Sequence, residues 1–198
     1  MTPTLTGLFI WKQVVALGYT PLESVLSVIG LIDDGILCVD PTSNDDTLLL
    51  ANRLSQRYQQ LHVIEFEWPK VSNNGSAIGV ASNFALAQSQ SDYVVNIQAD
   101  ECWPTALMEK VKALWPILVK SMGFEAFEFK VLHLEHNGQG LQGGGDWQRQ
   151  KGAAYTHAVK LWKKCPDYRF APDAWSIQAR GPDGKWDEVN FRIKTRVP

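Results

Sequence analysis

Hydrophobic residues in the first hundred positions alternate between two spacings, one typical of buried strands and one typical of amphipathic helices. Apolar runs predict strands at 6–15, 35–39, 61–66 and 92–97. Between them, apolar residues three and four positions apart predict helices at 20–30, 43–58 and 76–88. This alternation indicates an α/β fold with a mostly parallel, Rossmann-like central sheet flanked by helices.

Two segments carry sequence signals for the start of a helix. Thr20-Pro21-Leu22-Glu23 places Thr at the N-cap, Pro at the first helical position and Glu two residues further on, which predicts a capping box. Gly30 is expected to end that helix. Ser43 is expected to cap the next helix, with Asp46 in its first turn.

The second half of the chain has a less regular pattern. A helix is predicted from 104 to about 118, where Pro116 should kink or end it. Strands are predicted at 126–135, at 158–162 and near the C-terminus, after the turn signal GPDG at 181–184. The stretch NGQGLQGGG is too rich in glycine for regular structure and predicts a loop. We therefore expect one domain over 1–198 with a more irregular C-terminal half.

Composition and charge exclude several classes of protein. An apolar fraction of 45% is ordinary for a globular core, and the eight tryptophans are expected mainly to fill it. A net charge of −2 gives no basic face for nucleic acid. The three cysteines form no C-x-x-C pair, and no apolar run is long enough for a membrane span. Together with an N-terminus that lacks a signal peptide, this predicts a cytoplasmic protein.

Two predicted strands end in an acid. ILCVD ends at Asp40 and VVNIQAD ends at Asp100. Because ligands of open α/β sheets bind beyond the carboxyl ends of the strands, both acids are candidate binding residues. The structural alternatives are that Asp40 is a loop acid beside Ser43, and that Asp100 or Glu101 starts the helix announced by Pro104.

These motifs, in this order, resemble the inverting family 2 glycosyltransferases of the GT-A fold. That family has a strand ending V-D-x-x-S-x-D-x-T and a later strand ending D-x-D, often D-A-D-E; here the segments are VDPTSNDDT and DYVVNIQADE. The helix between them contains SNFALA, and the resemblance covers about residues 8–110. The later segments VLHLEHNGQG, AVKLWKK and YRFAPDAW are similar to short members of the family.

The resemblance implies a nucleotide-sugar half, about 1–103, and an acceptor half, about 104–198. Asp40 would accept hydrogen bonds from the nucleobase, such as N3–H of uracil, and Asp100 would bind Mn²⁺ or Mg²⁺. Gln98 stands where the family usually has Asp; it could reach the ribose but cannot supply the same charge. Asp45 matches the second Asp of the first motif, and we interpret it first as a structural residue at a helix N-terminus.

An inverting transfer also needs a carboxylate base that takes the proton from the acceptor hydroxyl. Asp173 in APDAW is the first candidate because the resemblance puts an x-D-A element there, although it could equally be a surface turn acid after Pro172. Asp146, after the triple glycine, is the second candidate, and Glu135 is the third.

The sequence thus predicts a metal-dependent glycosyltransferase that moves a sugar from a nucleotide-diphospho-sugar, a UDP-sugar first, to a glycan or other hydroxyl acceptor. The alternative is a catalytically degenerate nucleotide-sugar or glycan-binding domain, with Gln98 as the sign of lost catalysis. Neither G-x-G-x-x-G after the first strand nor a P-loop occurs, which argues against dehydrogenases and P-loop NTPases.

Overall fold

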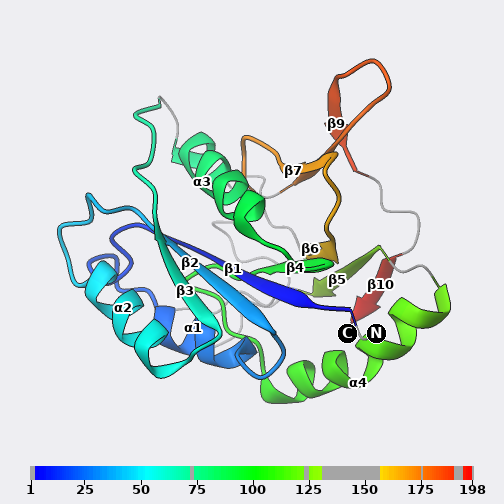
Figure 1. Cartoon of the computed structure of the whole chain (residues 1–198), viewed down its shortest axis with the longest axis horizontal. Helices are drawn as coiled ribbons and strands as arrows, with labels where there is room; N and C mark the ends of the chain where they lie inside the picture. Colours follow the sequence, from blue (N-terminus) through cyan, green and yellow to red (C-terminus); the bar gives the residue numbers. More distant parts are fainter. Residues whose placement is uncertain are drawn as a thin grey trace, which may run out of the picture.

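A computed structural model describes residues 3–71, 74–122, 125–130, 157–174, 176–189 and 194–197. They form a seven-stranded sheet in the order β10-β5-β6-β4-β1-β2-β3 and a three-stranded sheet in the order β7-β8-β9 (Figure 1). The strands are β1 Leu5–Trp11, β2 Asp34–Val39, β3 Leu61–Glu65, β4 Tyr93–Asn96, β5 Ala126–Lys130, β6 His157–Lys163, β7 Tyr168–Phe170, β8 Ile177–Arg180, β9 Trp186–Glu188 and β10 Lys194–Val197. The helices are α1 Pro21–Val28, α2 Thr47–Arg57, α3 Asn74–Gln88 and α4 Thr105–Met122.

The large sheet is parallel in its first half and mixed in its second. β1 lies between β2 and β4 and is parallel to both, and β3 is parallel to β2. β6 is antiparallel to its neighbours β4 and β5, while β10 is parallel to β5 at the edge. The α/β fold with a mostly parallel, mixed central sheet is therefore confirmed.

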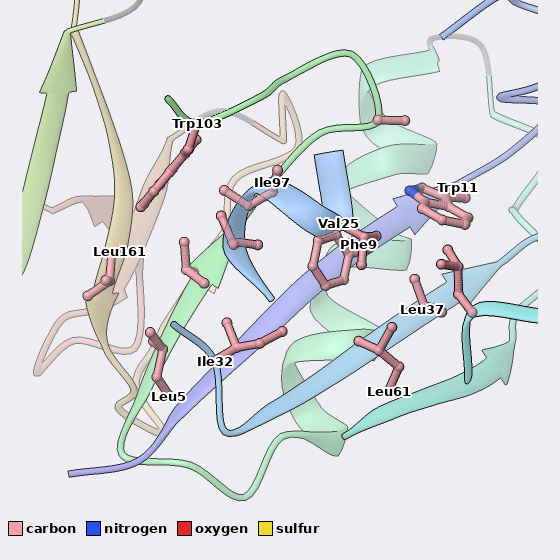
Figure 2. Packing of buried hydrophobic residues seen from close by; sticks show 14 of the residues in the cluster. Leu5, Phe9, Trp11, Val25, Ile32, Leu37, Leu61, Ile97, Trp103 and Leu161 are labelled. Carbon is pink, nitrogen blue, oxygen red and sulfur yellow. The ribbon is translucent and has the colours of Figure 1, made fainter. Parts of the chain in front are cut away.

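Alternate residues of the buried strands pack into two hydrophobic layers, one on each face of the sheet. On one face, Phe9 and Leu37 pack with Val25 of α1, in a cluster that α2 and α4 also enter (Figure 2). On the other face, Leu8 lies in a second cluster with Ala85 of α3. Figure 1 shows the same division, with α3 on the side of the small sheet and α1, α2 and α4 on the opposite side. Strands β1, β2 and β4 are buried at nearly every position because both faces of this part of the sheet are covered.

Two local predictions about helix starts are wrong. Thr20 is the N-cap of α1 and Pro21 its first residue, but the Thr20 side chain makes no capping bond; its hydroxyl lies 3.9 Å from Cys102 Sγ. Ser43 does not cap α2, which begins at Thr47, because its hydroxyl accepts the backbone N–H of Gln13 at 3.2 Å.

Of the two alternatives predicted for Pro116, a kink or the end of the helix, the structure excludes the second. α4 continues to Met122, and two residues of the turns that precede the proline, Val111 and Trp115, are buried in the core. We attribute the continuation to this burial, which outweighs the local cost of a missing backbone N–H. None of the helices within the described ranges combines the length and the apolar character that a bilayer crossing needs.

Candidate functional site

The two candidate acids lie at the same edge of the sheet, where the parallel strands β1, β2 and β4 end. Asp40 follows β2 directly, and its N–H donates to the Trp11 carbonyl at the end of β1, at 2.9 Å. The segment that carries Asp100 follows β4, and its Ala99 carbonyl accepts the N–H of Thr20 at 3.0 Å. The loop between β1 and α1 therefore contacts both acidic segments, and the sheet topology brings them to one edge.

The Asp40 carboxylate is fully buried, with 0% of the residue exposed. Its Oδ1 accepts the backbone N–H and the hydroxyl of Thr42 at 2.8 and 2.7 Å. Its Oδ2 accepts Lys12 Nζ at 2.6 Å and the Trp68 backbone N–H at 3.1 Å. Burial alone would raise the pKa of Asp40, but the hydrogen bonds from Lys12, Thr42 and Trp68 outweigh it and hold the pKa below its usual value. Since a carboxylate offers about four lone-pair positions, these four donors occupy all of them.

Lys12 reaches Asp40 from the loop that follows β1. Its side chain is 33% exposed, and Nζ lies 5.5 Å from the centre of the Trp68 ring, within the range of a cation–π contact. The next residue, Gln13, has φ of 51°, in the left-handed region that residues with a side chain rarely adopt. Strained residues of this kind are concentrated at functional sites, so the neighbouring Lys12 is a candidate functional residue.

Asp45 joins the same two loops. Its Oδ2 accepts the N–H of Ala16 at 2.7 Å, and its Oδ1 accepts the N–H of Thr47 at 3.1 Å. Burial alone would raise the pKa of Asp45, but hydrogen bonds from the Thr47 side chain and from the backbone N–H groups of Ala16, Thr47 and Val15 outweigh it and lower the pKa. Because Thr47 is the first residue of α2, Asp45 satisfies a helix N-terminus and holds the loop after β1, as the structural interpretation predicts.

Asp100 lies in a tight turn held by its neighbours. The N–H of Glu101 donates to the Gln98 carbonyl at 3.0 Å, and the N–H of Gln98 donates to Glu101 Oε2 at 3.1 Å. Glu101 Oε1 accepts Lys160 Nζ of β6 at 2.5 Å; the two side chains are only 18% and 8% exposed. Ser24 of α1 also donates its hydroxyl to the Gln98 carbonyl at 2.8 Å. The turn is thus bound to both α1 and β6, while Asp100 is exposed.

The donor set of this edge fits a divalent cation that takes few protein ligands. Within the described residues no three His, Cys, Asp or Glu side chains group as a metal site would require. Asp100 offers an exposed carboxylate, and Mg²⁺ in nucleotide sites is commonly held by one or two carboxylates, with phosphate oxygens and water as the other ligands. Gln98 adds at most a neutral amide oxygen, so any cation here depends on the ligand for its remaining partners.

Asp173 lies in a turn between β7 and β8. Its Oδ1 accepts the backbone N–H of Ser176 and its Oδ2 accepts the Ser176 hydroxyl, both at 3.1 Å. Ala174 between them has φ of 63°, the second positive value among the described residues that are not glycine. Asp173 is therefore an exposed residue of a surface turn, and its role as a base stays a prediction. Its carboxylate organises a strained turn.

The segment that leads to Asp173 is bound to α3. The Asn83 side chain donates to the Phe170 carbonyl at 3.0 Å and accepts the Phe170 N–H at 2.8 Å. Further along, a Cβ placed on Gly79 would meet the Ala171 carbonyl oxygen at 2.7 Å. Gly79 lies about one turn closer than Asn83 to the N-terminus of α3, the end of the helix that follows the carboxyl end of β3. The segment from Phe170 to Pro172 therefore runs along α3 toward the carboxyl edge of the sheet. Asp146 and Glu135, the other candidate bases, lie outside the described residues.

Three polar residues of this edge were missed in the sequence. Lys12 follows β1, Trp68 follows β3, and both contact Asp40. Sequence spacing gave no signal for these contacts, because the residues lie far apart along the chain. Lys160 belongs to the AVKLWKK segment, where a charged residue inside an otherwise apolar strand was the available signal. Its side chain is buried because it pairs with Glu101.

Comparisons with known proteins agree with this geometry. Residues 22–116, just under half of the 198-residue chain, match the model of the family described as Glycosyl transferase family 2. No curated protein matches the chain. The predicted resemblance to family 2 glycosyltransferases of the GT-A fold is confirmed.

Solved structures share the fold at low identity. TarS from S. aureus is 15% identical with a TM-score of 0.56, over 87% of this chain and 31% of TarS. TarS 1–349 is 14% identical with a TM-score of 0.52, over 81% of this chain and 47% of that one, and it has also been solved with UDP-GlcNAc. A mannosyltransferase from Pyrobaculum calidifontis in complex with GDP-Man and Mn²⁺ is 16% identical over 67% of this chain and 36% of that one, with a TM-score of 0.48. The chain spans less than half the length of either TarS structure.

Proposed function

We propose that this chain, whose residues 22–116 match the model of Glycosyl transferase family 2 and which shares the GT-A fold, moves a sugar from a nucleotide-diphospho-sugar to a hydroxyl acceptor, with inversion. The observation that carries the proposal is that Asp40 and Asp100 follow parallel strands at one edge of the sheet, within a chain that matches this family. A UDP-sugar is the first candidate donor, and the UDP-GlcNAc complex of TarS, a protein of the same fold, supports this choice.

In this proposal the residues before about 103 bind the donor. Asp40 accepts an N–H of the nucleobase, which takes the lone pair now used by Lys12, the donor with the longest side chain. Gln98 follows β4 at the same edge and is available to the ribose through its amide. The pairing of buried Asp40 with strong donors keeps it ionised, so that it acts as an acceptor.

Asp100 would hold a Mn²⁺ or Mg²⁺ ion that accompanies the diphosphate. When bound, such an ion supplies Lewis-acid stabilisation of the leaving diphosphate. The chain itself contributes an exposed carboxylate on a turn that Glu101 and Lys160 hold in place. Because Gln98 replaces the usual Asp, we expect the free protein to bind the cation weakly and to bind it more tightly with nucleotide present.

The residues after about 104 would bind the acceptor, a glycan or another hydroxyl compound, and supply the base. As the acceptor oxygen bonds to the anomeric carbon and the bond to the diphosphate breaks, the acceptor proton passes to a carboxylate. Asp173 is our first candidate because α3 directs its segment toward the carboxyl edge and because the neighbouring turn is strained. Asp146 is the second.

Substitution of Asp100 tests the donor site. In Asp100→Ala, calorimetric titration of UDP should show that added Mn²⁺ no longer increases affinity, because the carboxylate that binds the ion is gone. The matched control is Asp187→Ala, which removes an exposed aspartate of β9 and should keep the Mn²⁺ effect. Unchanged Mn²⁺-dependent affinity in Asp100→Ala would refute the assignment of Asp100.

Substitution of Asp173 tests the chemistry. Asp173→Asn should keep UDP-sugar affinity and slow transfer by about 10²–10⁴-fold, the contribution expected of a general base. Unchanged transfer would pass the role to Asp146. If the wild-type protein binds UDP-sugar but neither transfers nor hydrolyses it in the presence of Mn²⁺, the chain is a nucleotide-sugar-binding domain, not an enzyme.

A further inference from the structure

Lys12 holds a position that is chemically complementary to one edge of a nucleobase. Its ammonium is a hydrogen-bond donor, and it lies 2.6 Å from Asp40 Oδ2, which is an acceptor. A ligand that has a carbonyl group beside an N–H can replace the hydrogen bond between Lys12 and Asp40 with two of its own. Lys12 would donate to the carbonyl, and Asp40 would accept from the N–H. Uracil has such an edge in N3–H with its flanking carbonyls, and guanine has one in N1–H with O6. Cytosine and adenine lack a ring N–H, so neither presents this edge.

Of the four donors to Asp40, Lys12 is best suited to exchange with a ligand, because its side chain is long and flexible and comes from another loop. Two donors are the backbone N–H groups of Thr42 and Trp68, and the third is the Thr42 hydroxyl, two residues from Asp40. Lys12 reaches Asp40 through a long side chain that is 33% exposed. Because Asp40 has no exposed area, a base can contact it only where one of these donors moves aside, and Lys12 can do so by a rotation of its side chain.

The surroundings keep Lys12 close to this position when it moves. The loop that carries it is held by the Gln13 N–H on Ser43 and by the Gln13 side chain on Asn44, at 3.2 and 2.8 Å. The Trp68 ring, 5.5 Å from Nζ, provides a cation–π contact that does not depend on Asp40. A small shift of the ammonium therefore frees one lone pair of Asp40 and leaves the cation beside it.

We propose that Lys12 is a specificity-determining residue that, together with Asp40, selects a nucleobase with a carbonyl beside a ring N–H, uracil first, over cytosine and adenine. The inference rests on the proposed function, since it assigns the base contact of the same donor site. It assigns to Lys12 a role in base selection beyond its ion pair with Asp40.

The test compares UDP with CDP, because these ligands differ only in the base and their affinity ratio cancels the contributions of diphosphate and metal. We expect the wild-type protein to bind UDP at least tenfold more tightly than CDP by calorimetry, since cytosine leaves both Lys12 and Asp40 badly matched. In Lys12→Met the ratio should fall by about tenfold, the value of one hydrogen bond to a charged group. Lys12→Arg keeps a cationic donor and should retain most of the ratio. GDP compared with ADP provides a second arm with the same expectation.

Controls separate this role from a loss of folding. Lys70→Met removes an exposed lysine two residues after Trp68 and should leave the ratio unchanged. Melting temperatures of all variants report any general destabilisation, which lowers both affinities without changing their ratio. A ratio in Lys12→Met equal to that of the wild type overturns the proposal, and so does an increase in UDP affinity, which would make Lys12 only a competitor for Asp40. If the wild-type protein binds none of the four nucleotides, the proposed function itself fails.

Discussion

The close approach of α3 to the segment before Asp173 gives a sharp test of how the second half of the chain is positioned. In Gly79→Ala, the added Cβ would lie 2.7 Å from the Ala171 carbonyl oxygen and 3.3 Å from Pro172 Cα. Both contacts are to backbone, which cannot rotate away as a side chain can. The Ala171–Pro172 segment must therefore move from α3, or the helix must bend.

Two opposing terms set the magnitude. Replacing a helical glycine by alanine ordinarily stabilises a helix by about 1 kcal/mol. Overpacking of a tight contact costs about 1–3 kcal/mol. We expect a net loss of about 1 kcal/mol, which for a domain of this size lowers the melting temperature by about 2–4 °C. If Asp173 is the base, its displacement should also reduce the transfer rate by about tenfold or more while UDP affinity stays unchanged.

The assay is differential scanning calorimetry of Gly79→Ala beside Gly30→Ala. Gly30 follows α1, and a Cβ there meets no atom within 4 Å, so alanine at this position should be neutral or slightly stabilising. A Gly79→Ala protein that melts at or above the wild-type temperature would show that α3 and the Ala171–Pro172 segment are not in contact, and the argument for the direction of Asp173 would fail with it.

Three further predictions follow from single features of the structure. Lys160→Met should lower the unfolding free energy by about 3 kcal/mol, because it leaves the largely buried Glu101 carboxylate without its cationic partner. Calorimetry should show that the double variant with Glu101→Gln recovers stability. A melting temperature unchanged by Lys160→Met alone would contradict the ion pair. The pKa of Asp40 is lowered in the folded protein. The stabilisation that ionised Asp40 gives the fold is therefore complete above the unfolded pKa near 3.9, and it is lost as the pH falls from that value toward the folded pKa. Urea unfolding between pH 6 and pH 2.5 measures this loss, and a free energy of unfolding that does not change with pH would contradict it. Burial, with a smaller contribution from nearby Asp40, raises the pKa of Cys38 to about 12. Iodoacetamide at neutral pH should therefore label exposed Cys102 and leave Cys38 unmodified, as read by mass spectrometry. Labelling of both cysteines in the folded protein would contradict the burial of Cys38.

The sheet and its helices could be predicted from the sequence because each depends on local pattern. Buried parallel strands such as ILCV are apolar at every position, and Pro21 marks a helix start whether or not a capping bond forms. Interactions between loops could not be predicted this way. The Ser43 hydroxyl caps nothing because Gln13, thirty positions earlier, offers it a backbone N–H, and no local signal reports a partner at that distance.

The same distinction applies to the candidate site. The positions of Asp40 and Asp100 at one edge could be predicted, since strand order and direction alone bring strand ends together. The state of each acid could not. Asp40 is buried under four donors, whereas Asp100 is exposed, and the difference comes from Lys12 and Trp68, which lie 28 residues away on either side.

For Asp40, the structural and the functional interpretation are therefore compatible. A carboxylate that only closed a loop would be satisfied by Thr42, which supplies two hydrogen bonds within the same turn. The third and fourth donors come from two other loops, one of them through a half-buried lysine beside a strained residue. A replaceable donor on a buried acceptor is an arrangement that a ligand can complete, because the ligand needs only to match the hydrogen bond it displaces. Loop closure explains the Thr42 contacts of Asp40, and the proposed nucleobase binding would explain why a replaceable lysine completes them.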